Sequence, residues 1–178
     1  FDGSVSGLDI TISGSRDESV KQRIDEGLEF EDFFEQNSPE NKVGHQFLAM
    51  EPEEDSFILE HSLVTSIFPA FSKMDAYAEW AMSQDTRIQF THLRDTLKYL
   101  QWQGLGDVSK RWLLKCPMYY GLEHELLDVF PDAYLIMTHR DPKTTLASSM
   151  KLLTYFFKPY SNREILDQVP LYLHGQAK

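Results

Sequence analysis

Hydrophobic residues recur with a helical period along much of the chain. In the acidic segment 17–35, Val20, Ile24 and Leu28 lie four residues apart, so they share one face of a predicted helix. Pro52 and the three carboxylates after it suit a helix start. Similar spacing predicts helices in residues 57–71, 75–80, 86–102, 122–130 and 142–157. The apolar stripe of the last helix consists of Leu146, Met150, Leu153 and Phe157.

Two short apolar runs have a different pattern. Residues 112–114 (Trp-Leu-Leu) and 134–138 (Tyr-Leu-Ile-Met-Thr) predict buried strands. With the helix at 122–130 between them and another helix behind, they form a βαβ unit with parallel strands and a right-handed crossover. We therefore expect an α/β fold with a parallel β-sheet flanked by helices. Residues 8–12 are either an edge strand or a flexible lead-in.

The formal net charge of −11 is concentrated at the front of the chain. Residues 1–60 hold sixteen Asp and Glu against four Lys and Arg, whereas residues 98–158 hold eight Lys and Arg against six Asp and Glu. The later half can therefore receive an anionic ligand, but nucleic acid is not an expected partner, because it requires a basic face. We divide the chain into an acidic N-terminal segment (1–44) and an α/β domain (45–178), with a helical part at 52–103 and a βαβ core at 111–157.

Composition excludes several classes of protein. The 178 residues include twelve Phe, eight Tyr and three Trp, too many aromatic side chains for a disordered chain. No apolar run reaches the 18 or so residues of a membrane span, and no signal peptide is recognisable. Cys116 is the single cysteine, which excludes an internal disulfide and favours a reducing, cytoplasmic compartment. No Cys/His cluster has metal-ligand spacing, so no metal is expected.

Cationic side chains follow both predicted strands. Lys115 ends the first strand and Arg140 ends the second, and ligands of open parallel sheets bind at the carboxyl ends of strands. Arg140 also precedes a helix that Asp141 can cap and Pro142 can begin, and a helix start with an adjacent Arg suits a phosphate. Ser148, seven residues after Asp141, projects from a similar side of the helix, so its hydroxyl can donate a further hydrogen bond to the same anion. The alternative is structural: Asp141 and Pro142 only cap a helix, and Lys115 only ends a strand in solvent.

Three motifs surround these residues. They are Arg111-Trp112-Leu113-Leu114-Lys115-Cys116-Pro117, Phe130-Pro131-Asp132-Ala133, and Thr138-His139-Arg140-Asp141-Pro142 followed by Ser148. Together they resemble the bacterial-type branch of the PAPS-dependent sulfotransferase family, with its R-W-h-L-K-[SC]-P, F-P-D-A and T-H-R-D-P motifs. Upstream, the same order is kept by His45, Pro52-Glu53-Glu54-Asp55, Tyr77, Trp80 and Leu100-Gln101-Trp102. The resemblance covers roughly residues 45–155.

The resemblance implies a fold related to P-loop NTPases, here truncated, and PAPS as co-substrate without a metal. It implies transfer of a sulfuryl group to a hydroxyl or amine of a small-molecule, glycan or lipid acceptor. Arg140 and Ser148 would bind the 3′-phosphate of the donor. Lys115 would stabilise charge on the sulfuryl group in transit, which is the main task in transfers of this kind.

Two features depart from the family's pattern. The Gly/Ser-rich phosphosulfate loop is not recognisable in residues 3–7 or 13–16, so we expect it upstream of Phe1, in a longer or processed protein. Many relatives have His where this chain has Tyr119, and a Tyr with an ordinary pKa of about 10 is a poor general base. His45 is the substitute candidate, because the family places a His before its P-E-E segment. The identity of the base stays open.

The sequence therefore predicts a PAPS-dependent sulfotransferase with Lys115, Tyr119 and His45 as catalytic candidates. The alternative is a catalytically inactive or fragmentary sulfotransferase-like binding module, which the missing loop and Tyr119 favour. A nucleotide kinase of the same broad fold would need a G-x-x-x-x-G-K-[ST] loop, and the chain does not contain that sequence.

Overall fold

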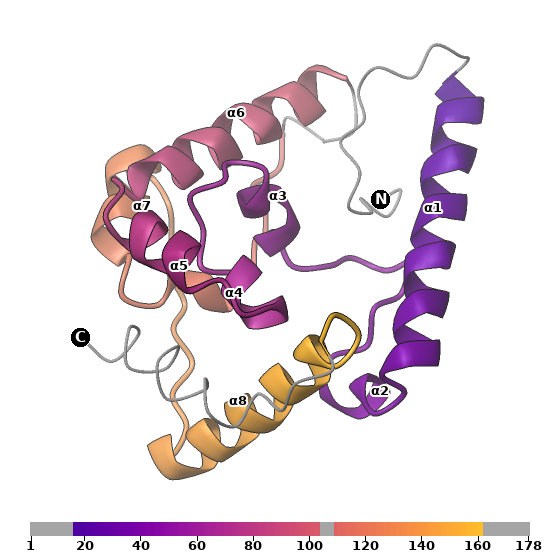
Figure 1. Cartoon of the computed structure of the whole chain (residues 1–178). Coiled ribbons are helices and arrows are strands. Elements are labelled where there is room, and N and C mark those ends of the chain that lie inside the picture. Colours follow the sequence, from indigo (N-terminus) through magenta and orange to yellow (C-terminus); the bar gives the residue numbers. More distant parts are fainter. Residues whose placement is uncertain (1–15, 104–108, 162–178) are drawn as a thin grey trace.

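A computed structural model describes residues 16–103 and 109–161, and the regular structure within these ranges is helical (Figure 1). The helices are α1 (Arg16–Asn37), α2 (Asn41–Gly44), α3 (Ser56–Glu60), α4 (Phe68–Phe71), α5 (Asp75–Met82), α6 (Arg87–Trp102), the short 3-10 helix η1 (Pro117–Tyr119), α7 (Glu123–Val129) and α8 (Pro142–Phe157). Figure 1 shows α1 along one side of the molecule, with the short helices α3 and α4 between α6 and α8.

The main hydrophobic core forms around α6. Phe90, Leu93 and Leu97 are spaced by three and four residues, so they share one helix face, and all three are buried. This face packs against α3 and α7. The core as a whole consists of Leu59, Phe90, Leu93, Leu97, Cys116 and Leu126. The extended chain that ends at Cys116 is therefore held against the same core as the three helices.

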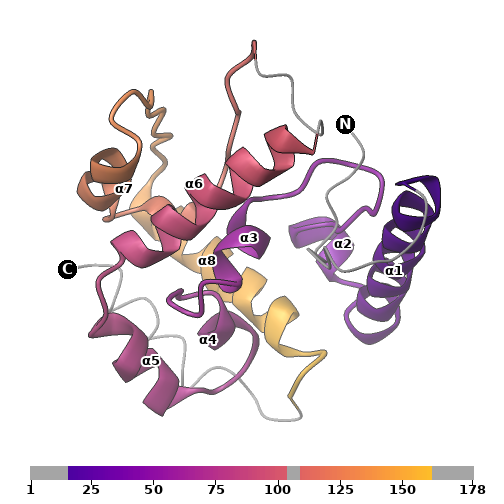
Figure 2. The ribbon, with the colours of Figure 1, turned by 90° about the horizontal axis from the view of Figure 1, so that it is seen from above.

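A second, smaller core lies between α4 and α8. It consists of Ala70, Leu153 and Phe157, with Met150 packed against it. Helix α8 also contacts α2, which in turn contacts α1, and Figure 2 shows this group from above. Because Leu153 and Phe157 lie four residues apart, they present one face of α8 to these neighbours.

The ring of Phe47 lies among aromatic rings of α1, α3 and α8. Its ring centroid lies 4.6 Å from that of Phe34 in α1 and 5.8 Å from that of Phe57 in α3. It also lies 6.0 Å from the ring of Phe156 in α8. Phe47 is buried, so a single side chain makes apolar contact with α1, α3 and α8.

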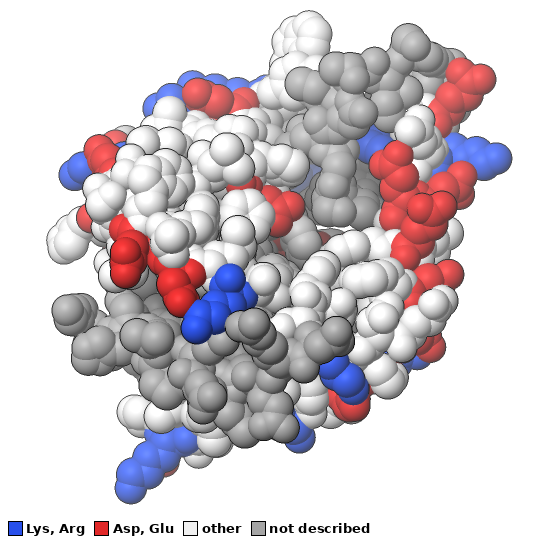
Figure 3. All heavy atoms as spheres, in the orientation of Figure 1, with Lys and Arg blue, Asp and Glu red and all other residues white. Residues whose placement is uncertain are grey.

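Acidic side chains gather along α1 (Figure 3). The exposed acidic residues of this helix include Asp25, Glu26, Glu29, Asp32 and Glu35. Its other face carries Phe30 and Phe34, whose rings contact each other and Phe47. The helix that the sequence predicts at 17–35 is thus confirmed, and its charge lies on the solvent side.

The predicted parallel sheet is wrong. Within residues 16–103 and 109–161 no β-strand is present, and the segments 111–116 and 133–141 run outside regular structure. Leu113 is 92% exposed and Ile136 is 89% exposed, so the two apolar runs are not buried strands. The chain is helical in its described part, and the α/β fold class with a P-loop NTPase-like sheet does not hold for it. The strand considered at 8–12 lies outside the described residues.

The physical reason is that a strand needs a partner, whereas a helix satisfies its own backbone. Residues 111–116 do alternate between exposed and less exposed positions, as a strand would. No backbone ladder joins the segments 111–116 and 133–141, and the side chain of Arg111 contacts Asp132 and Tyr134 instead. Arg111 donates to the backbone carbonyl of Asp132 at 3.0 Å, and its guanidinium lies 5.0 Å from the ring centroid of Tyr134.

Two helical predictions also need correction. The apolar segment 57–71 is not one helix but two short ones, α3 and α4, separated by a loop in which Leu63 has a φ of 59°. α3 ends at Glu60, and a right-handed helix cannot continue through Leu63, because its left-handed φ lies outside the helical region. In α8, Leu146 is 47% exposed, and the buried stripe begins later, at Leu153.

The remaining predicted helices are confirmed as α5, α6, α7 and α8, with ends close to those expected. Within the described ranges, none of these helices combines the length and the apolar character that a bilayer crossing requires. The loop considered at residues 3–7, and residues 13–15 of the loop considered at 13–16, fall outside the described residues. The boundary at residues 44 and 45 between an N-terminal segment and a domain stays a prediction.

Candidate active site

The residues just before α3 bring two distant parts of the chain together. Glu54 forms an ion pair with the ammonium group of Lys115. Asp55 accepts a hydrogen bond from the backbone N–H of Lys115 at 3.0 Å and another from the hydroxyl of Tyr119. Residues about sixty positions apart in the sequence therefore meet at one place in the fold.

Asp55 is buried, with 6% of its surface exposed. It occupies the N-cap position of α3, where an Asp side chain usually accepts a hydrogen bond from its own helix. That local bond is absent here, and the carboxylate is directed to Lys115 and Tyr119 instead. Burial raises the pKa of Asp55 above its usual value, and the hydrogen bond from Tyr119 opposes this rise.

Tyr119 lies at the end of η1 with its ring against the main core. Its ring centroid is 5.7 Å from that of Phe90 in α6. Burial, followed by the negative charge of Asp55, raises the pKa of Tyr119 well above its usual value. The hydroxyl therefore stays protonated, and it donates a hydrogen bond to the Asp55 carboxylate. Burial likewise raises the pKa of the neighbouring Cys116 thiol to about 12, so this cysteine is not a nucleophile at neutral pH.

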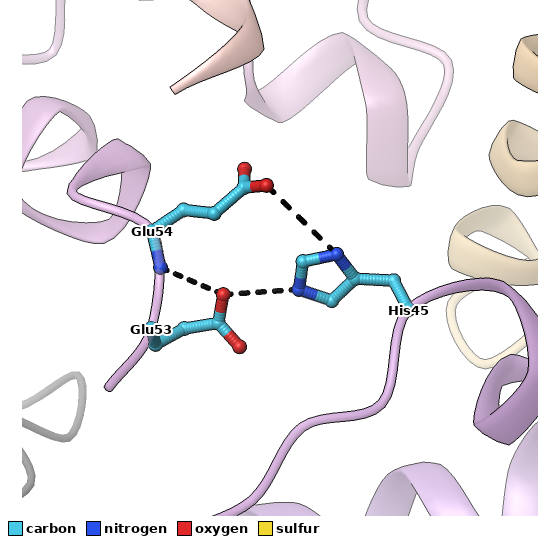
Figure 4. Close-up of side chains that lie close together, drawn as sticks. All are labelled: His45, Glu53 and Glu54. Carbon is cyan, nitrogen blue, oxygen red and sulfur yellow. Dashed lines mark hydrogen bonds and ion pairs between the residues drawn. The ribbon is translucent and has the colours of Figure 1, made fainter. Parts of the chain in front are cut away.

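The imidazole ring of His45 lies between Glu53 and Glu54 (Figure 4). Its Nε2 atom is 3.0 Å from a carboxylate oxygen of Glu53, and its Nδ1 atom is 4.0 Å from a carboxylate oxygen of Glu54. The rings of Phe47 and Phe156 lie 5.0 and 5.7 Å from the imidazole. His45 follows α2 directly, so α2, α8 and the residues before α3 together position this ring.

The side chains of His45, Glu53 and Glu54 also bring together atoms of the kinds that coordinate metal ions. One donor atom of each lies within 4.8 Å of the other two, and imidazole with carboxylates suits several divalent metals. The sequence contains no Cys/His cluster with metal-ligand spacing, so it does not predict a metal at this position. Lys115 would compete with a metal for Glu54, since its ammonium group is paired there.

Arg140 directly precedes the Asp141 cap of α8, whereas Ser148 is the seventh residue of that helix, and both residues are exposed. Asp141 caps this helix by accepting a hydrogen bond from the backbone N–H of Lys143 at 2.8 Å, and Pro142 is the first helical residue. The predicted cap and helix start are therefore confirmed. Among the described residues, no hydrogen bond or ion pair joins Arg140 or Ser148 to the cluster around Asp55.

Comparison with known proteins decides the family. A sequence profile of the sulfotransferase family matches residues 11–177, which is nearly the whole chain. The chain belongs to the sulfotransferase family. This membership supports sulfuryl transfer as its general activity. Neither the curated proteins nor the solved structures gave a match to this sulfotransferase.

The cluster of this sulfotransferase contains the three catalytic candidates that the sequence indicates. Lys115 contacts Glu54, Tyr119 contacts Asp55, and His45 contacts Glu53. The structure thus brings the three candidates to one tripeptide, residues 53–55. Their catalytic roles, and the phosphate-binding roles of Arg140 and Ser148, stay predictions.

The sequence did not indicate that residues 53–55 organise the cluster. Their carboxylates suit a helix start, and α3 does begin directly after them. The side chains, however, point to other parts of the chain. The available signal was their position among the family motifs, since Pro52-Glu53-Glu54-Asp55 keeps the family's order relative to His45. Which side chain each carboxylate contacts is decided only in three dimensions.

Proposed function

We propose that this sulfotransferase uses PAPS as its donor and a hydroxyl or amine as its acceptor, carried by a small molecule, a glycan or a lipid. The observation that supports this most is the convergence of Lys115, Tyr119 and His45 on residues 53–55. In the transfer, the acceptor oxygen or nitrogen forms a bond to sulfur, and the bond between sulfur and the bridging phosphate oxygen breaks. Adenosine 3′,5′-bisphosphate leaves with that electron pair, and the acceptor's proton passes to a base.

Lys115 supplies positive charge to the sulfuryl group in transit. Fixed positive charge near developing negative charge is a large contribution to catalysis in water-poor sites. The Lys115 side chain is 72% exposed and its ammonium group rests on Glu54. Donor binding therefore exchanges one anionic partner of Lys115, the Glu54 carboxylate, for another, the bridging or equatorial oxygens of the donor.

His45 acts as the base in this proposal. A neutral imidazole has one nitrogen that donates and one that accepts a proton, and the contact between Nε2 and Glu53 can fix which is which. This is the arrangement in which a carboxylate orients a histidine base. Tyr119 serves instead as a hydrogen-bond donor to Asp55, because burial and that carboxylate raise its pKa.

Arg140, Ser148 and the start of α8 bind the 3′-phosphate of the donor. The free N–H groups and the dipole of a helix N-terminus favour phosphate, and α8 has sixteen residues. Arg140 directly precedes the Asp141 cap, so its guanidinium belongs to the same end of the helix. The exposure of both side chains leaves them accessible to a ligand.

The test is calorimetric titration of adenosine 3′,5′-bisphosphate into the protein and its Arg140→Ala variant. We expect the variant to bind more weakly by about 1.5–3 kcal/mol, the usual value of a hydrogen bond to a charged group. Lys151→Ala is the matched control, since Lys151 is an exposed cation further along α8 whose ammonium lies against Tyr155. It removes the same charge and should leave the affinity unchanged.

Equal weakening by both substitutions would indicate a general charge effect and contradict the 3′-phosphate site. The titration should also be run on the protein extended by whatever residues its gene encodes before Phe1. No binding by that folded protein would overturn the donor assignment.

A second candidate function is a binding module without catalysis. The observation that favours it is the hydrogen bond from the Tyr119 hydroxyl to Asp55. Tyr119 stands where many relatives carry a histidine, and its hydroxyl is engaged in this bond. This alternative predicts that the protein binds adenosine 3′,5′-bisphosphate but transfers no sulfuryl group from PAPS to any of a panel of hydroxyl and amine acceptors.

A further inference from the structure

We propose that Asp55 is a positioning residue, which holds the backbone of Lys115 so that its ammonium group stands beside Glu54 and His45. The inference rests on the proposed function, because it assigns Lys115 to the transferring sulfuryl group. Asp55 itself touches neither donor nor acceptor in this arrangement. Its effect on the reaction passes through Lys115.

The hydrogen bonds of Asp55 show that its role is not local. An Asp at an N-cap ordinarily stabilises its own helix, but the Asp55 side chain makes no such bond. It accepts instead from the backbone N–H of Lys115 and from the hydroxyl of Tyr119. A buried carboxylate is costly without such partners, so the pairing specifies where the segment carrying Lys115 must lie.

The neighbours of Asp55 make this placement relevant to the site. Glu54, the preceding residue, holds the ammonium group of the same Lys115. One dipeptide therefore holds both ends of that lysine, with Asp55 at the backbone and Glu54 at the tip of the side chain. The segment 111–116 lies outside regular structure, so it has no strand ladder within the described residues that would fix Lys115 by other means.

The decisive variant is Asp55→Ser. Ser is about as good an N-cap as Asp, so α3 keeps its start, but the shorter side chain does not reach Lys115 and Tyr119. With PAPS and an accepted substrate, we expect kcat to fall about 10- to 100-fold while the donor KM changes less than about threefold, because the lost interaction acts mainly in the transition state. Asp55→Asn, whose amide oxygen can still accept from Lys115, should recover at least tenfold of this loss.

The control and the coupling measurement separate positioning from simple stability. Asp128→Asn is the control, because it alters another hydrogen bond between distant elements, the one that Arg87 of α6 donates to Asp128 of α7 at 2.8 Å. This substitution should leave kcat unchanged. In a Lys115→Ala background, Asp55→Ser should cause no further loss of kcat, since the two substitutions remove one effect. An equal loss in that background would show that Asp55 does not act through Lys115.

Hydrogen exchange at the Lys115 amide gives a readout that does not depend on activity. The amide should exchange at least tenfold faster in Asp55→Ser than in the unsubstituted protein, and Asp55→Asn should restore its protection. Unchanged exchange would overturn the inference even for an active enzyme. If the protein proves inactive, faster exchange would still support the positioning role while the proposed function fails. Should Asp55→Ser not fold, the double variant with Tyr119→Phe carries the same test, because it removes the buried hydroxyl left without a partner.

Discussion

At the residue scale, the carboxyl groups of this protein differ sharply in their surroundings. Asp55 is buried against two donors, whereas Glu60, five residues later at the end of α3, is only partly buried. Burial raises the pKa of Glu60 to about 7. A carboxyl that is half protonated at neutral pH links the stability of the fold to pH in this range.

Glu60→Gln should stabilise the protein at pH 8 but not at pH 4.5. Because the folded-state pKa lies above the unfolded value, the folded protein binds the proton more tightly, and stability falls as pH rises from about 4.5 through about 7. Removing the charge should recover about 1–2 kcal/mol at pH 8, a value reduced for the side chain's remaining access to water. Urea denaturation at both pH values measures this. Glu79→Gln, on an exposed carboxylate of α5, is the control, and an equal gain at both pH values would contradict the role of Glu60.

At the element scale, α8 has a start defined by both a side-chain cap and a proline. Asp141 supplies the cap, and Pro142 lacks the N–H that would otherwise need a partner at this position. The helix then runs to Phe157, where its buried residues meet α4. The proposed phosphate site lies at the same end of the helix as the cap. Arg140 tests binding there, and Asp141 tests stability.

Asp141→Ala should destabilise the protein by about 1 kcal/mol, the usual cost of losing an N-cap. The reason is that the backbone N–H of Lys143 loses its acceptor. The measurement is the free energy of unfolding in urea. Lys143→Ala keeps both the N–H and its acceptor and should have little effect. Equal destabilisation of the two variants would contradict the assignment of the effect to the cap, because Lys143→Ala leaves the cap hydrogen bond intact.

At the scale of the whole molecule, the two hydrophobic cores are connected through aromatic rings. The core around α6 and the core between α4 and α8 share no buried residue. Phe47 lies in contact with rings from α1, α3 and α8. The candidate site depends on this connection, since the His45 ring also contacts Phe47 and Phe156.

Phe47→Ala should destabilise the protein by about 3–5 kcal/mol, the usual loss for a buried Phe. It should also weaken the proposed transfer activity, because His45 loses one of the two rings beside it. Urea denaturation followed by circular dichroism measures the first effect. Phe33→Ala removes a ring that is 37% exposed and should cost clearly less. Comparable losses would show that Phe47 does not connect the two cores.

Most of the helices, and the residues that meet in the candidate site, could be predicted from local sequence and its motifs. Helices α1, α5, α6, α7 and α8 follow from apolar spacing, and the α8 cap follows from Asp141 and Pro142, because a helix forms its hydrogen bonds within one segment. The motifs also indicated Lys115, Tyr119 and His45 as candidates. Each of these inferences uses residues that are neighbours in the sequence.

Only the tertiary structure decided the rest. Residues 111–116 and 133–141 have extended patterns, but a strand also requires a backbone partner elsewhere in the chain, and their local sequence does not reveal whether one is present. The carboxylates of Glu53, Glu54 and Asp55 look alike in the sequence, yet they contact His45, Lys115 and Tyr119 respectively. Such assignments depend on contacts between residues tens of positions apart, which local spacing does not determine.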